Sequence, residues 1–128
     1  MSETNTTLPE PETIDQVTKE KYILITFTLK KQFGKKPDLN GIIFLIGMQE
    51  LGQVREFTKE EKIDLMHIAT CKLLSYEGYY SFTGRDADGW PQWNLEKPLP
   101  PYDLFSQEVL LKKNIVRYFE EENLPMQP

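Results

Sequence analysis

The segment from Leu39 to Leu51 constrains the fold most, because its apolar side chains point in every direction around a helix. At roughly 100° per residue they leave no wide polar face, which is typical of the central, most buried helix of a bundle. Asp38 provides an N-cap before the segment, and Gly52 can end it. Two glycines inside it would let neighbouring helices approach closely. A buried strand over residues 42–46 is the weaker alternative.

A second helical pattern runs from Thr13 to Phe33. Thr13 with Gln16 three residues later matches a capping box, and Gly34 provides a stop. Apolar residues recur between these signals at helical spacing: Ile14, Tyr22, Ile25, Leu29 and Phe33. The middle of the stretch is rich in strand-forming residues, but the end signals and the stripe favour a helix.

Two more helices complete the predicted fold. Thr58 with Glu61 is a capping box that opens a helix running to about Ser75. The last helix runs from after Asp103 to about Glu121. We therefore expect a mainly α, four-helix bundle-like single domain over residues 13–122, with a flexible N-terminal tail at 1–12 and a C-terminal tail at 123–128.

An aromatic-rich segment, residues 76–102, separates the last two helices. The chain has fifteen aromatic residues, which are seven Phe, six Tyr and two Trp, and seven of the fifteen lie in this segment. The segment therefore forms a second core or a surface for recognition. Residues 79–83 and 90–95 fit a small hairpin. Packing as a second small core is favoured, because packing must order so long a loop. The compatible alternative is a recognition surface, whose candidate residues are Tyr79, Tyr80, Trp90 and Trp93.

The only histidine and the only cysteine, His67 and Cys71, lie on one side of the third helix with Glu60 and Asp64. This face is bordered by apolar residues of the same helix, which we expect to face the core: Ile63, Ile68 and Leu74. We therefore expect its polar groups to be at least partly buried and paired. The favoured interpretation is that Asp64 or a backbone carbonyl satisfies His67, while Cys71 packs as a small apolar residue. Glu50, late in the second helix, could add a carboxylate to the same site.

A metal site or a cysteine nucleophile on this face is disfavoured. One histidine cannot supply the two carboxylate–histidine motifs of a di-iron bundle, and a single pair of ligands falls short of a zinc site. Cys71 sits late in its helix, where the dipole does not favour a thiolate. The run of residues 86–89 looks like half of a calcium loop but lacks the other ligands, so a tight, solvated turn is expected. We therefore expect no metal, no cofactor and no catalytic residue.

Charge and composition limit the kinds of partner and the cellular compartment that we expect for this protein. A net charge of −5 argues against nucleic-acid binding, and one cysteine cannot form an internal disulfide, which suits a reducing compartment. No apolar run is long enough to span a bilayer, and the N-terminus lacks a signal-peptide pattern. The sequence predicts a soluble, acidic, cytoplasmic protein without membrane contact.

Three motifs carry a family resemblance. At LIGMQELG (45–52), DLMHIATC (64–71) and GRDADGWP (84–91), the chain resembles a family of short, uncharacterised bacterial proteins, over most of residues 13–121. The resemblance implies no activity, cofactor or catalytic residue.

Two functional hypotheses remain. The favoured one is a non-enzymatic interaction or assembly module, and Ile23, Leu24 and Phe27, which lie off the main stripe of their helix, suggest a homodimer or another protein partner. The alternative is a small-ligand- or metal-binding protein, or an enzyme, with a site around Glu50, Asp64, His67 and Cys71.

Overall fold

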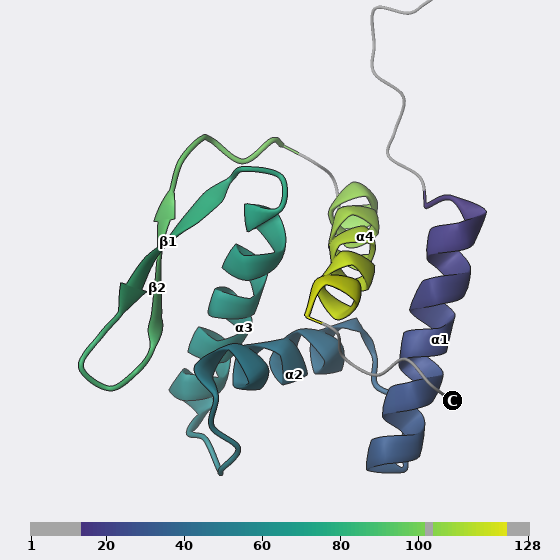
Figure 1. Cartoon of the computed structure of the whole chain (residues 1–128), viewed down its shortest axis with the longest axis horizontal. Coiled ribbons are helices and arrows are strands. Elements are labelled where there is room, and N and C mark those ends of the chain that lie inside the picture. The colour runs from purple at the N-terminus through teal and green to yellow at the C-terminus, as the bar shows by residue number, and fades with distance from the viewer. Residues whose placement is uncertain (1–13, 102–103, 123–128) are drawn as a thin grey trace, which may run out of the picture.

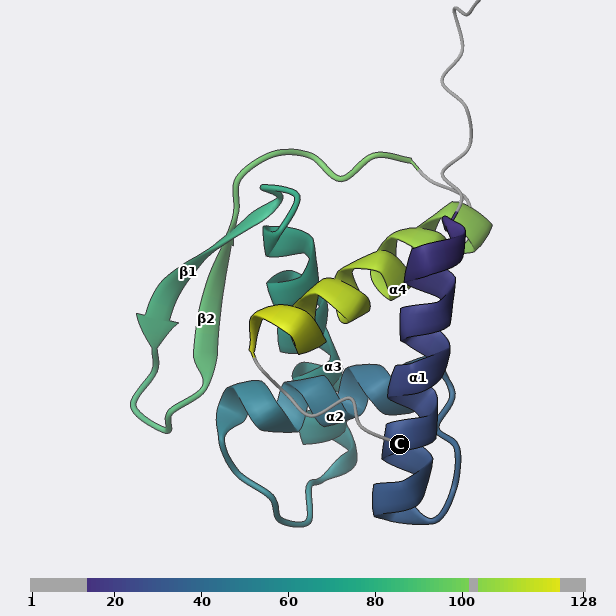
Figure 2. The same ribbon diagram turned by 45° about the vertical axis from the view of Figure 1, so that its right-hand side comes forward.

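The computed structural model describes residues 14–101 and 104–122, which form four helices and one antiparallel hairpin (Figure 1). In chain order these are α1 (Gln16–Phe33), α2 (Leu39–Leu51), α3 (Lys59–Ser75), β1 (Tyr80–Arg85), β2 (Pro91–Leu95) and α4 (Leu104–Glu121). The mainly α prediction is confirmed. The bundle is not confirmed, because α2 runs across the directions of α1 and α3 in both ribbon views (Figures 1 and 2).

Helix caps follow the sequence signals with one correction. Asp38 caps α2 by accepting from the Gly41 amide, and the Thr58–Glu61 capping box of α3 forms both of its hydrogen bonds. The expected cap at Thr13 lies outside the described residues. The structure caps α1 instead at Asp15, whose carboxylate accepts from the Thr18 amide at 2.8 Å. Both Asp and Thr are favoured N-cap residues, so residue type alone does not show whether the helix begins after position 13 or position 15.

Close packing of α2 on α3 occurs at one glycine. A Cβ placed on Gly47 would lie 2.3 Å from the backbone oxygen of Leu65 on α3, a distance that real Cβ atoms do not adopt. The other glycine of the helix, Gly41, faces Pro37 and Asp38 and is not a helix–helix contact. Only a residue without a side chain at position 47 therefore allows α2 to cross α3 this closely.

Two apolar clusters fill the interior. The main core joins all four helices, with Ile25 of α1, Ile42 of α2, Leu73 of α3 and Ile115 of α4 fully buried. A second cluster forms where α2, α3 and the loop between them meet: Leu51, Phe57, Leu65 and Ile68. Trp90 and Trp93 of the hairpin pack against this second cluster.

Two residues expected in the core are on the surface. Phe33 of α1 and Ile63 of α3 are each 61% exposed. Both lie near a helix end where no neighbouring element covers them, which helical spacing alone cannot show. No described helix has the length and apolar character needed to cross a membrane.

The Gly47 contact gives a stability prediction. Gly47→Ala should lower the free energy of unfolding by about 1–3 kcal/mol, because the added methyl group overlaps the Leu65 backbone. Urea unfolding measures this loss. Asn40→Ala, at an exposed position of the same helix, reports the gain in helix propensity alone and should not destabilise. A Gly47→Ala variant as stable as Asn40→Ala would contradict the packing described.

Candidate functional site

A pocket with a volume of about 440 Å³ lies between α3 and the hairpin. This size falls within the range of small-ligand pockets. Its wall on the helix side is Glu61, Asp64, His67 and Ile68, and its wall on the hairpin side is Asp86, Asp88, Trp90, Pro91, Gln92 and Trp93. The pocket thus joins two features that the sequence suggested separately, the polar face of α3 and the aromatic segment.

The polar face of α3 is open to solvent, which corrects the expected burial. Glu60, Asp64 and His67 are all exposed, and only Cys71 is buried. The physical reason is that Ile63, expected to border this face with core contacts, is itself exposed. His67 is therefore a pocket residue and not a satisfied core residue.

Cys71 lies beneath the histidine. Its Sγ is 3.5 Å from His67 Nε2, and the side chain is fully buried. Burial raises the pKa of the Cys71 thiol to about 11, and a hydrogen bond with Tyr80 offsets only part of this effect. The Tyr80 ring meets the His67 ring edge-on, with 6.5 Å between centroids. The thiol is thus held neutral and covered, which does not suit a nucleophile.

A tight turn places the hairpin carboxylates. Asp86 Oδ1 accepts from the amides of Asp88 and Trp90, at 3.0 and 2.8 Å. Gly89, with φ of 87°, adopts the left-handed conformation that closes this turn. The expected solvated turn over residues 86–89 is therefore present, and it presents two carboxylates beside Trp90.

Arg85 fixes the turn against the rest of the molecule. Its guanidinium donates to the backbone oxygen of Gly89 at 2.8 Å and to that of Glu50 at 2.9 Å. The Glu50 oxygen belongs to the last turn of α2, where carbonyls lack helical partners and favour a cation. Arg85 therefore ties the pocket wall to α2. No local sequence pattern marks Arg85 for this role, because the contact joins residues 35 positions apart.

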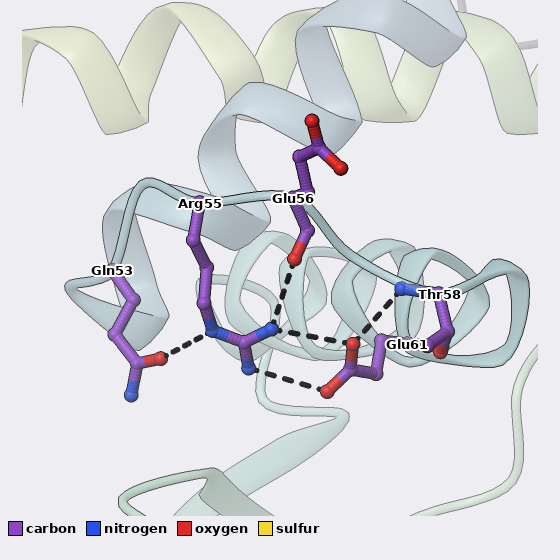
Figure 3. Close-up of polar contacts among 5 residues, drawn as sticks. All are labelled: Gln53, Arg55, Glu56, Thr58 and Glu61. Carbon is purple, nitrogen blue, oxygen red and sulfur yellow. Dashed lines mark hydrogen bonds and ion pairs between the residues drawn. The ribbon is translucent and has the colours of Figure 1, made fainter.

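Charge in the pocket is unbalanced. The carboxylate of Glu61 is paired, since Arg55 holds both of its oxygens and the Thr58 amide donates to one of them (Figure 3). The Arg55 hydrogen bonds are the main reason that the pKa of Glu61 is lowered. By contrast, Asp64, Asp86 and Asp88 form no ion pair with any described residue. No lysine or arginine lines the pocket.

The remaining predicted residues lie elsewhere. The Glu50 carboxylate accepts from the Tyr118 hydroxyl at 2.7 Å, away from His67. Glu60 is exposed but does not line the pocket. Tyr79 lies beside Leu74 and Leu99, with the Lys97 ammonium 4.6 Å from its ring centre. The proposed set of Glu50, Glu60, Asp64, His67 and Cys71 is therefore not one site.

Among residues 14–101 and 104–122, no three His, Cys, Asp or Glu side chains are grouped closely enough to hold a metal ion. Comparisons with protein-family models, with curated proteins and with solved structures found no match for the chain. The resemblance to a bacterial family thus stays a prediction.

The hydrogen bond between Glu50 and Tyr118 gives a prediction that two matched variants can test. Tyr118→Phe removes the hydrogen bond to Glu50 and should cost about 1–2 kcal/mol of unfolding free energy. Tyr76→Phe removes a buried hydroxyl that has no partner among the described residues, so it should be neutral or stabilising. Denaturant unfolding of both variants measures the difference. Equal losses would argue against the Tyr118–Glu50 bond.

Cys71 gives a reactivity prediction. A pKa of about 11 in place of 9.0 leaves roughly a hundred-fold less thiolate near pH 8. The native protein should therefore react with N-ethylmaleimide at least that much more slowly than a variant carrying Cys71→Ser and Ala87→Cys, whose thiol lies on the exposed turn. Mass spectrometry over time measures both rates. Labelling of Cys71 as fast as that of the exposed thiol would show that it is not buried.

Proposed function

We propose that this protein is a non-enzymatic interaction module, and that the pocket between α3 and the hairpin binds a lysine or arginine side chain of a partner protein. The observation that carries the proposal is the composition of the pocket wall. Three carboxylates that form no ion pair with any described residue, Asp64, Asp86 and Asp88, share the wall with Trp90 and Trp93.

This combination suits an organic cation. Carboxylates form charge-assisted hydrogen bonds with ammonium and guanidinium groups, and tryptophan is the ring that attracts a cation most strongly. A guanidinium can also lie flat on an indole while its edge meets a carboxylate. Both walls of the pocket supply a carboxylate, so a cation inside it would be held from α3 and from the hairpin together.

The rival proposals receive less support. A metal site needs three or four converging ligands, whereas these carboxylates are spread around a pocket of about 440 Å³. Chemistry through Cys71 would need an exposed thiolate, and this thiol is buried with a raised pKa. His67 is then a polar residue in the helix-side wall of the pocket, where its ring can accept or donate a hydrogen bond.

Fluorescence provides the test, because the only two tryptophans of the chain both line the pocket. A tetra-arginine peptide should change the tryptophan emission saturably, and added salt should weaken the binding. Asp64→Asn and Asp88→Asn should each weaken binding about three- to fivefold, since each removes one attractive charge.

The matched control is Glu60→Gln, which removes a charge from the same helix outside the pocket. It should leave the binding curve nearly unchanged, and a tetra-glutamate peptide should give no response. Loss of affinity by the same factor in all three variants would indicate attraction to overall charge. That outcome, or no response to tetra-arginine, would refute the proposed site.

A further inference from the structure

A second surface, on α1, carries an inference independent of the pocket. The inner side of α1 buries Ile25 and Leu29 in the main core. On the opposite side Ile23 is 43% exposed, Phe27 is 54% exposed and Leu24 is half-buried. At roughly 100° per residue, these three lie within about 100° of one another. We call this side, with Glu20 and Lys31, the outer face of α1.

Two opposite charges flank the apolar centre of the outer face. Glu20 and Lys31 project into the same arc as Ile23, Leu24 and Phe27, by the same step of roughly 100° per residue. The Glu20 carboxylate receives one hydrogen bond, from Gln16. Within the described part of the chain, neither Glu20 nor Lys31 forms an ion pair. Both charges are thus available to a partner.

The order of residues along the outer face is self-complementary. Leu24 and Phe27 lie at equal distances on either side of a midpoint between residues 25 and 26, and so do Glu20 and Lys31. A two-fold axis at this midpoint would set Leu24 against the partner's Phe27 and Glu20 against the partner's Lys31. Each contact would occur twice, as isologous interfaces require.

We propose that the outer face of α1 binds the same face of a second copy of this chain, with the two helices antiparallel. The charges select this orientation, because parallel helices in register would set Glu20 against the partner's Glu20 and Lys31 against the partner's Lys31. Lys19 and Lys30 project just outside the arc, beside Ile23, and so lie at the edge of the contact. The partner is a second copy because this axis exchanges Leu24 with Phe27 and Glu20 with Lys31. Ile23 has no apolar counterpart under the axis and lies at the edge of the contact.

Sedimentation velocity over a range of concentrations tests the dimer. The wild-type chain should form a dimer, and Phe27→Glu should yield a monomer with unchanged helix content by circular dichroism. Ile63→Glu is the control, because Ile63 is at least as exposed as Phe27 but lies on α3. A wild-type chain that stays monomeric at all concentrations, or a dimer that Phe27→Glu leaves intact, would overturn the proposal.

Charge reversal tests the pairing. Lys31→Glu should raise the dimer dissociation constant about tenfold, since two attractive pairs become repulsive. Lys62→Glu, which makes the same change in net charge on α3, should have no such effect. The double variant Glu20→Lys/Lys31→Glu should recover the wild-type constant. A double variant that remains as weak as Lys31→Glu would overturn the Glu20–Lys31 pairing.

Cross-linking tests the orientation. A mixture of Glu20→Cys chains and size-tagged Lys31→Cys chains should form a mixed dimer with a short bifunctional maleimide. Each variant alone should not, because in the antiparallel arrangement the two copies of position 20 lie about 16 Å apart along the helix axes. Cross-linking of each variant with itself, and not of the mixture, would instead establish parallel helices and overturn the proposal.

Discussion

The contact between Gly47 of α2 and the backbone of Leu65 on α3 positions the rest of the molecule. It allows α2 to lie across α3 at a distance that any side chain would forbid. Leu65 is fully buried at this crossing and is part of the second apolar cluster. Trp90 and Trp93 pack on that cluster, so the hairpin, and with it one wall of the pocket, takes its place from the crossing of α2 and α3.

Arg85 adds a hydrogen bond to these apolar contacts. Through the Glu50 carbonyl it connects the turn of the hairpin to the end of α2, the helix that the Gly47 contact holds in place. The carboxylates of Asp86 and Asp88 therefore stand on a turn that is fixed on both sides, by tryptophan packing and by the guanidinium. A preorganised wall of this kind loses little conformational freedom when a ligand binds.

Local signals predicted the secondary structure well, because each depends on residues three or four positions apart. The capping box at Thr58 and Glu61, the cap at Asp38 and the stops at Gly34 and Gly52 are all present. The hairpin formed close to the expected residues, as β1 (Tyr80–Arg85) and β2 (Pro91–Leu95). The crossing of α2 over α3 was not predictable, since the apolar pattern of a segment does not indicate which elements will pack against it.

The site was predictable in parts but not as a whole. The sequence indicates Asp64 and His67 as one candidate site and Trp90 and Trp93 as a separate candidate surface. The sequence predicts a partly buried His67, but the residue is exposed beside an exposed Ile63. The exposure of Ile63 depends on how the chain folds back on itself. Glu50 lies outside the pocket and bonds Tyr118 instead, a long-range contact that its position late in α2 does not reveal.

We infer that the hairpin and α3 form one pocket for a cationic side chain, and an NMR titration tests this inference most directly. The chain has two tryptophans and one histidine, so its nitrogen–proton NMR spectrum has two indole signals and one imidazole as reporters, all from the pocket wall. Titration with a tetra-arginine peptide should move all three signals along a common saturation curve, while the amides of the outer face of α1 stay unchanged. Reporter signals that do not move at saturating peptide, or that move no more than the amides of α1, would contradict it.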